Sequence, residues 1–238
     1  MNSKYTGQKQ IAGVHHKIIN QIPVFSEMIE LFAGSAQITK LIDLDGKKCT
    51  LIDADKKVID NLRNEWTENS FHHSQLNGVI HFYHTDAIDY LESTNDDSFT
   101  FRKGRFIFID PPYHHSTRPN NKEIYKFEMT HEQHVELLQQ SLQLNCMCMI
   151  IHPVCELYET MLKDWRKIEV KIRYHRKTSI EGIYMNYPEP TQLQDYSFLG
   201  SDSWDRQRIT KRVYALKKKF ENMPVLERNK YLKILNQL

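Results

Sequence analysis

The sequence predicts an α/β fold, with a mostly parallel β-sheet, helices on both faces and a basic helical extension at the carboxyl end. Short apolar runs alternate four times with amphipathic stretches, which indicates strand–helix units joined by right-handed crossovers. The chain then ends in a long segment dense in lysine and arginine. With 238 residues, the protein is long enough for one substantial core.

The first half of the chain alternates strand and helix from its start. Apolar runs predict strands at 28–32, 48–52, 81–84 and 106–109, and helices at 10–21, from about 37, after the second strand to about 66, and at 87–93. An acid stands at or near the end of each of these strands, namely Glu30, Asp53, Asp86 and Asp110. Ligands of such sheets bind beyond the carboxyl ends of the strands, so we expect a site at this edge.

The second half begins with a helix whose start is marked by a capping box. Thr130 can cap this helix and Gln133 stands at the reciprocal position, so the helix is expected to run from there to about 144. A fifth strand at 146–152, a closing hairpin of 165–175 and 182–187, a basic helix at 202–220 and a final helix from about 226 are expected to follow. The hairpin completes the sheet, and the last two helices form the extension.

Composition indicates a globular protein of a reducing compartment. Hydrophobic residues make up 40% and charged residues 26%, and no apolar run approaches the ~20 residues that a membrane span needs. The N-terminus carries no apolar signal-peptide core. Cys146, Cys148 and Cys155 stand in a hydrophobic stretch and are expected to be reduced thiols. We therefore expect a cytoplasmic location.

Charge is distributed unevenly along the chain. Residues 204–238 contain ten lysines and arginines against three acids, so this tail carries +7 and the rest of the chain −5. Such asymmetry suits a phosphate backbone as partner. A solvated surface helix is the alternative, and composition alone does not choose between the two.

The tetrapeptide Asp110-Pro111-Pro112-Tyr113 follows an apolar strand and combines residue types suited to holding an exocyclic amino group. The Asp110 carboxylate and the Pro111 carbonyl can each accept a hydrogen bond from an NH2 group. The two prolines fix φ and remove competing backbone donors, and Tyr113 offers a face on which a base can stack. An ordinary Asp-Pro turn is the alternative. The full tetrapeptide favours a site for a nucleobase amine.

A second candidate site lies in the first strand–helix turn. Glu30, Phe32 and Gly34 belong to a strand end and a turn of small residues, where backbone amides can approach a cofactor. Asp53, about twenty residues further on, is placed to accept hydrogen bonds from both hydroxyls of a ribose, and Asp86 to meet an adenine amino group. The alternatives are a plain strand–helix turn and two helix N-caps.

Four motifs follow one another in the order of the Dam-type, D12-class adenine-specific DNA methyltransferases: Lys4-Tyr5-Thr6-Gly7-Gln8-Lys9-Gln10, Glu30-Leu31-Phe32-Ala33-Gly34, Leu51-Ile52-Asp53-Ala54-Asp55 and Asp110-Pro111-Pro112-Tyr113. The resemblance covers roughly residues 3–190, and its last part looks like members borne by phages and mobile elements. It implies a Rossmann-like methyltransferase sheet, S-adenosylmethionine as cofactor and N6 of a flipped adenine in duplex DNA as acceptor, ahead of cytosine N4.

The resemblance also implies roles for single residues. Tyr5 and Lys9 would close over the cofactor, and Phe32 would pack on it. Asp53 would bind the ribose, and Asp86 would lie near the cofactor's adenine.

Two features depart from the Dam-type pattern. Ala36 stands where the first motif usually carries a second glycine, which predicts a tighter cofactor loop. Only 32 residues separate Asp53 from Asp86, so the helical DNA-recognition domain that many members insert there is absent. DNA contacts are therefore expected from the loop at 113–126 and from basic side chains of the hairpin and the C-terminal helix, namely Arg173, Arg176, Lys177, Arg208, Lys211, Arg212 and Lys219.

We expect residues 1–200 to form the catalytic domain and 201–238 the extension, in a monomer or a homodimer. No metal is expected, because the spacing of the histidines and cysteines does not match a metal knuckle and methyl transfer from a sulfonium requires none. His114 and His115 are candidate substrate contacts. Two alternatives remain: the same fold acting on RNA adenine or a protein amide, and a catalytically silent nucleic-acid-binding subunit.

Overall fold

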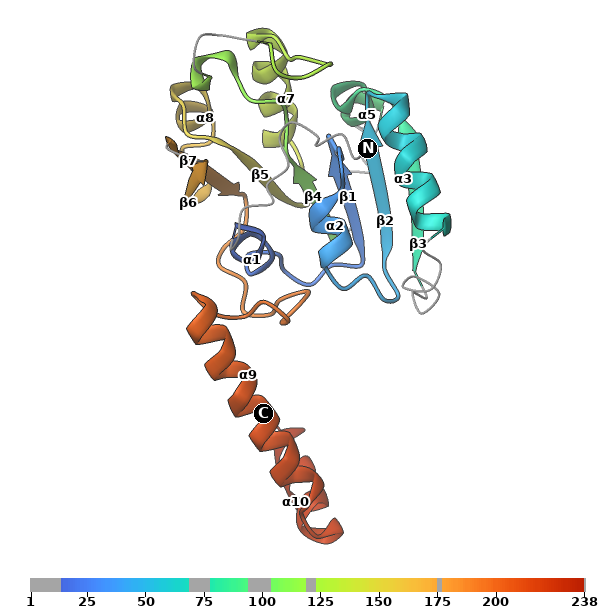
Figure 1. Cartoon of the computed structure of the whole chain (residues 1–238), viewed down its shortest axis with the longest axis vertical. Helices are drawn as coiled ribbons and strands as arrows, with labels where there is room; N and C mark the ends of the chain where they lie inside the picture. Colours follow the sequence, from blue (N-terminus) through green and yellow to red (C-terminus); the bar gives the residue numbers. More distant parts are fainter. Residues whose placement is uncertain (1–13, 69–77, 94–103, 119–122, 175–176, 238) are drawn as a thin grey trace. The chain divides into compact units, whose positions relative to one another are not determined.

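The computed structural model of the chain describes residues 14–68, 78–93, 104–118, 123–174 and 177–237. The chain divides into two compact units, Met1–Asp195 and Tyr196–Leu238, which are described separately. Figure 1 labels the helices and strands of both units.

The first unit is built on a seven-stranded sheet in the order β3-β2-β1-β4-β5-β7-β6 (Figure 1). The four pairs from β3 across to β5 are parallel, whereas β7 runs antiparallel to both of its neighbours. The strands are β1 (Glu27–Leu31), β2 (Lys48–Asp53), β3 (Val79–His84), β4 (Arg105–Ile109), β5 (Met147–Pro153), β6 (Arg166–Tyr174) and β7 (Lys177–Met185). The predicted parallel sheet is confirmed.

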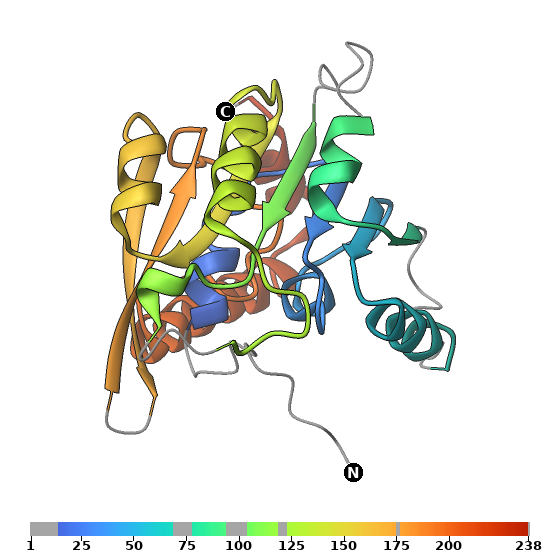
Figure 2. The ribbon, with the colours of Figure 1, turned by 90° about the horizontal axis from the view of Figure 1, so that it is seen from above.

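Helices cover both faces of this sheet (Figure 2). They are α1 (Val14–Ile19), α2 (Gln37–Leu41), α3 (Lys56–Glu68), α5 (Ala87–Ser93), α7 (His131–Leu142) and α8 (Glu156–Met161), with a 3-10 turn η1 (His115–Thr117). Strands β1 and β4 are buried along their whole length. Because helices shield both sides of these central strands, most of their residues are apolar, and the buried Glu27 of β1 pairs with Arg105 of β4 at 2.8 Å.

A hydrophobic cluster fills the space between the sheet and α5, α7 and α8. Ile107, Ile109 and Ile150 come from the strands, while Leu91 and Leu137 come from two of the helices. Aliphatic side chains of this size contribute about 1.5–3 kcal/mol each when fully buried. This cluster holds β4 rigidly, and β4 delivers the tetrapeptide that follows it.

The expected elements are confirmed with small shifts at their ends, and two differ. The capping box of α7 forms as predicted between Thr130 and Gln133. Helix α8 is not predicted by the sequence. Strand β7 begins at Lys177 rather than at 182, because Gly182 lies inside the strand, where the Tyr184 ring crosses it. A Cβ atom at Gly182 would lie 2.6 Å from that ring.

The second unit consists of two helices. Helix α9 (Ser203–Glu221) begins at Asp202, whose carboxylate accepts the Asp205 N–H at 2.8 Å. Helix α10 (Val225–Leu235) follows Pro224, and the rings of Phe220 and Tyr231 meet with centroids 6.5 Å apart. Both predicted helices are confirmed. Over the described part of the chain, no helix has the length and apolar character needed to cross a membrane.

Candidate active site

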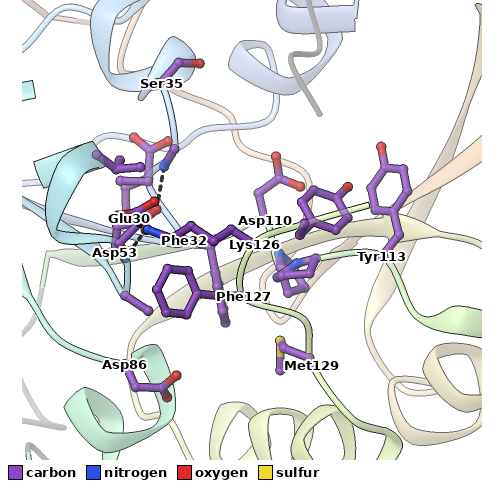
Figure 3. Close-up of a pocket in the computed structure, with 18 of the residues that line it drawn as sticks. Glu30, Phe32, Ser35, Asp53, Asp86, Asp110, Tyr113, Lys126, Phe127 and Met129 are labelled. Atoms are coloured by element: carbon purple, nitrogen blue, oxygen red, sulfur yellow. Dashed lines mark hydrogen bonds and ion pairs between the residues drawn. The ribbon is translucent and has the colours of Figure 1, made fainter. Parts of the chain in front are cut away.

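A cavity of about 660 Å³ lies at the carboxyl ends of the central strands (Figure 3). Its wall contains every predicted cofactor and catalytic residue that the structure describes: Glu30, Phe32, Gly34, Asp53, Asp86, Asp110, Pro111, Pro112 and Tyr113. Tyr5 and Lys9 lie outside the described residues. The structure therefore brings the two predicted sites together into a single cavity.

The loop between β1 and α2 has an unusual backbone. Phe32, Gly34 and Ala36 all adopt positive φ angles, of 58°, 50° and 47°. The left-handed region costs a residue with a side chain roughly 1–2 kcal/mol, and only glycine visits it freely. Ala36 therefore strains the turn that the sequence predicts to be tight. The turn directs the Gly34 N–H toward β2.

Asp53, at the end of β2, ties this loop in place. Its Oδ2 accepts the Gly34 N–H at 2.9 Å, and its Oδ1 accepts the Asp55 N–H at 2.8 Å. Burial raises the pKa of Asp53, while the two amides act in the opposite direction. Each carboxylate oxygen has a further lone pair, so Asp53 can accept additional hydrogen bonds from a ligand.

Glu30 is a carboxyl group almost without solvent, with 3% of the residue exposed. The Thr39 hydroxyl donates a hydrogen bond to its Oε2. Burial raises the pKa of Glu30 to about 8, and the nearby Asp110 charge adds to the effect. The carboxyl is therefore mostly protonated at neutral pH, and a cationic ligand beside it would favour ionisation.

Asp86 caps α5 and lines the cavity as well. Its Oδ1 accepts the Ile88 N–H at 2.7 Å. The N-cap that the sequence leaves as an alternative is thus present, and it is compatible with a second contact to a ligand.

At the other end of the cavity, Tyr113 is held from three sides. Its hydroxyl donates to the carboxylate of Glu181 on β7. Its ring meets the rings of Tyr125 and His152 edge to face, with centroids 6.2 and 5.9 Å apart. Burial, then the Glu181 charge, raises the pKa of Tyr113 well above its ordinary value. The phenol is therefore neutral and fixed beside Asp110 (Figure 3).

His152 fixes the backbone that follows the tetrapeptide. Its Nε2 accepts the His114 N–H at 2.9 Å, and its Nδ1 lies 2.7 Å from the Pro153 carbonyl. Only a neutral ring with its proton on Nδ1 satisfies both contacts. The ring also stacks on Tyr158 with centroids 3.8 Å apart. The His114 ring contacts His131, with 3.1 Å between Nε2 of His114 and Nδ1 of His131.

A buried ion pair organises the segment after the tetrapeptide. Arg118 donates to both oxygens of Glu128 at 2.8 and 2.5 Å, and it also donates to the Tyr113 carbonyl. Glu128 in turn accepts the N–H groups of Ile124 and Tyr125. Although burial opposes it, the Arg118 guanidinium and these amides hold the pKa of Glu128 at about 2. The pair therefore stays charged at all ordinary pH values.

The same segment reaches across to the turn between β2 and α3. Lys126 lies 2.9 Å from Asp55, directly after the Asp53 loop, and Phe127 lines the cavity nearby. The sequence predicts DNA contacts from the loop at 113–126, and four of its described residues line the cavity, namely Tyr113, Ile124, Tyr125 and Lys126. Residues 119–122, which include the Asn120-Asn121 pair, lie outside the described part.

Metal ligation finds no support among the residues that the structure describes. They contain no group of three or more histidine, cysteine, aspartate or glutamate side chains that could hold a metal ion. His152, which stands near cysteines in the sequence, has a different role in holding the turn after the tetrapeptide.

The predicted DNA-contacting residues occupy two separate elements. Arg208, Lys211, Arg212 and Lys219 are exposed on α9, where their spacing places them along one face. Arg208 also pairs with Asp205 at 2.5 Å. The backbone of Arg173 and Lys177 belongs to the paired ends of β6 and β7, and Arg176 lies outside the described residues.

The sheet order with one reversed strand, and the cavity beyond its central strands, define a Rossmann-like α/β fold with a candidate site at the carboxyl ends of its strands. A family model described as conserved hypothetical protein 95 matches residues 10–171, which is more than half of the chain. The chain belongs to this family. The description of this model does not name the Dam-type class, so adenine in DNA as the acceptor stays a prediction.

Solved structures with a similar fold include several methyltransferases. A candidate methylase from Haemophilus influenzae is 15% identical, with a TM-score of 0.41, and the match covers 73% of this chain and 91% of that one. A candidate RNA methyltransferase from Pyrococcus horikoshii is 14% identical, with a TM-score of 0.44, and the match covers 71% of this chain and 75% of that one. The N-methyltransferase NodS from Bradyrhizobium japonicum is 12% identical, with a TM-score of 0.48, and the match covers 73% of this chain and 94% of that one. Among curated proteins, none matches the chain.

Proposed function

We propose that the protein transfers a methyl group from S-adenosylmethionine to the exocyclic amino group of a nucleobase in nucleic acid, with N6 of adenine as the acceptor. One observation carries the proposal. Asp110 and Tyr113 line the same cavity as the Gly34 loop and Asp53 (Figure 3). Direct methyl transfer requires donor and acceptor within one enclosure, held in mutual orientation.

The cofactor end of the cavity fits S-adenosylmethionine by size and charge. A volume of about 660 Å³ is within the range of small-molecule sites. Three acids, Glu30, Asp53 and Asp86, face a ligand that carries an ammonium and a sulfonium charge, and Phe32 and Phe127 add aromatic faces. When bound, S-adenosylmethionine supplies a methyl group activated by its positively charged sulfur.

The residues of the chain then have distinct tasks. Asp53 keeps the cofactor loop closed and offers its remaining lone pairs to the ribose hydroxyls. The Asp110 carboxylate and the Pro111 carbonyl accept the two N–H groups of the acceptor amine, so that its lone pair is directed at the methyl group. Tyr113 supports the flipped base, whose extrusion costs a few kcal/mol. The amine proton is lost after transfer, to Asp110 or to solvent.

Duplex DNA and RNA are both candidate polymers. The order of the four motifs favours DNA, through the resemblance to the Dam-type class. RNA adenine is the second candidate, because the chain matches a different family and has only 32 residues between Asp53 and Asp86, too few for that class's inserted DNA-recognition domain. Either polymer presents phosphates to the basic face of α9.

The decisive experiment offers labelled S-adenosylmethionine with duplex DNA, single-stranded DNA, RNA and protein in parallel, and identifies the modified nucleoside. We expect N6-methylated adenine in one nucleic acid. Asp110→Ala should lower the rate by about 10²–10³-fold and leave cofactor affinity unchanged, because it removes one oriented group at the reacting centre. The exposed Asp164 provides a matched control as Asp164→Ala. Label found only in protein, or an Asp110→Ala variant above half the wild-type rate, would contradict the proposal.

The basic face of α9 gives a separate test of the nucleic-acid partner. Neutralising Arg208, Lys211, Arg212 and Lys219 should weaken binding regardless of base sequence. For each phosphate that the variant no longer neutralises, the slope of log K against log salt should flatten by about 0.9 on duplex DNA, or about 0.7 on a single strand. Cofactor affinity serves as the internal control. An unchanged salt slope would move the phosphate contacts to the β6–β7 hairpin.

A further inference from the structure

Strand β7 carries a buried acid beside the acceptor end of the cavity. Glu181 is 1% exposed, whereas carboxylates are almost never fully buried unless they are paired. The hydroxyl of Tyr113 donates to its Oε1, across 68 residues of sequence. Glu181 is not part of the cavity wall, but Tyr113 is. Glu181 therefore contacts the wall of the cavity through the Tyr113 hydroxyl.

The geometry around Tyr113 makes this contact decisive for the orientation of the ring. Tyr125 and His152 meet the ring at interplanar angles of 71° and 77°, and the hydrogen bond to Glu181 holds its far end. His152 cannot turn aside, because both of its ring nitrogens contact the backbone. Rotation of Tyr113 about χ1 would carry the hydroxyl away from Glu181 and open the wall of the acceptor site.

We propose that Glu181 is a positioning residue for the acceptor, which holds the Tyr113 ring in the orientation on which a nucleobase stacks beside Asp110. This inference rests on the proposed function and adds a residue to its machinery. A phenol that donates to a carboxylate is also more electron-rich than a free phenol. Such a ring favours the positive charge that develops on the attacking amine.

A merely structural contact makes different predictions. A buried hydrogen bond that only stabilises the fold can be replaced by apolar groups at little cost, and its removal does not distinguish acceptor from cofactor. A positioning contact instead changes acceptor kinetics while cofactor affinity stays constant. Gln at position 181 keeps an oxygen that accepts from the phenol and removes only the charge, so it separates the role of the hydrogen bond from that of the carboxylate.

The test compares Glu181→Gln, Glu181→Ala, Tyr113→Phe and the double variant Tyr113→Phe/Glu181→Ala. We expect Glu181→Ala to lower kcat/KM for the nucleic acid about tenfold, on the scale at which neighbouring residues are coupled, with cofactor Kd unchanged. Glu181→Gln should recover most of this loss. The double variant should lose no more than the worse single variant, because both substitutions remove the same contact.

A spectroscopic measurement checks the contact without any turnover. In an ultraviolet titration corrected by subtraction of Tyr113→Phe, the Tyr113 phenol of the wild-type protein should stay protonated until the protein unfolds. In Glu181→Gln the same phenol should ionise at lower pH, because the neighbouring negative charge is gone.

The outcomes separate the two proposals. If the wild-type protein methylates a nucleic acid and Glu181→Ala does so with unchanged kcat and KM, the positioning role is overturned and the proposed function stands. If the wild-type protein methylates no nucleic acid, the proposed function is overturned and the acceptor role of Glu181 with it. A Tyr113 phenol that ionises in the folded wild-type protein at the pH of an ordinary tyrosine would overturn the contact itself.

Discussion

The two ends of the cavity are built in opposite ways. At the cofactor end, the supporting contacts are local: Asp53 accepts from Gly34, 19 residues away, and from Asp55, two residues away. At the acceptor end they are distant: His114 is held by His152 across 38 residues, and Tyr113 by Glu181 across 68. The contacts around Asp53 thus form between neighbouring strands and turns, whereas the contacts that hold His114 and Tyr113 require the completed sheet.

This difference predicts an asymmetry in how substitutions act. Substitutions that break a contact between residues distant in sequence should lower the rate of acceptor methylation, while the affinity for the cofactor stays the same. Changes in the β1–α2 loop should do the reverse. The following predictions test this separation, beginning with the largest effect.

The buried ion pair behind the tetrapeptide should give the largest effect. Arg118→Met leaves Glu128 without its cation, and breaking a buried pair in this way costs about 3–5 kcal/mol. We expect a loss of about 3 kcal/mol in the free energy of unfolding, measured with urea, because Glu128 retains two backbone amides and some solvent contact. Arg118→Met/Glu128→Gln should recover part of this loss. A cofactor affinity that falls as steeply as acceptor methylation would refute the separation of the two ends.

The second effect concerns Asp53. Asp53→Ala removes the acceptor for two backbone amides and the predicted ribose contact, and hydrogen bonds to a charged group are worth about 1.5–3 kcal/mol. We expect cofactor Kd to rise about 30-fold or more, measured by calorimetry, with acceptor KM little changed at saturating cofactor. Asp164→Ala again provides the control. A cofactor Kd equal to that of wild type would place the ribose contact elsewhere.

The third effect is a pH dependence carried by Glu30. Its folded pKa of about 8 lies above the unfolded value of 4.5, so the folded protein binds more protons between these values. The free energy of unfolding gained from Glu30 is therefore fully present below 4.5 and is lost as the pH rises toward 8, by up to about 1.4 kcal/mol per pH unit. Glu30→Gln should flatten this slope in urea titrations at several pH values. The same slope in both proteins would show that another group carries it.

The smallest effect tests the strained loop. Ala36→Gly relieves a left-handed alanine, and after the added freedom of the unfolded chain is subtracted it should stabilise the protein by about 0.5–1 kcal/mol. Gly34→Ala is the matched control with opposite sign, because Gly34 has the same backbone region and no steric clash at Cβ. A destabilised Ala36→Gly variant would show that the alanine side chain has a packing role that outweighs its strain.

The sequence predicts the position of three acids along one edge of the sheet for a physical reason. Glu30, Asp53 and Asp86 each stand at or just after a strand end, and strand ends are visible as the point where an apolar run stops. Because parallel strands end at the same edge, their alignment follows from topology alone. The helix N-cap at Asp86 and the capping box of α7 are equally local and equally predictable.

The acceptor end can be predicted only in part. The tetrapeptide itself is visible in the sequence, but the residues that hold it in place are not. Arg118 and Glu128 look like surface residues until the fold brings them together as an ion pair. Glu181 stands just outside the expected strand, and nothing in the sequence around His152 indicates its hydrogen bond to the backbone after the tetrapeptide. A tight loop at Ala36 is predictable, although its left-handed backbone requires the structure.

The position of β7 in the sheet has a consequence for synthesis. Among the strands that the structure describes, β7 comes last in the chain, yet it inserts between β5 and β6 instead of adding at an edge. Chains emerge from the ribosome at about 5–20 residues per second and fold from the N-terminal side, so the 68 residues between Tyr113 and Glu181 represent roughly 3–14 seconds. A nascent chain therefore makes the Gly34–Asp53 contact several seconds before the Tyr113–Glu181 contact, and the proposed base methylation would become possible only when β7 has been made.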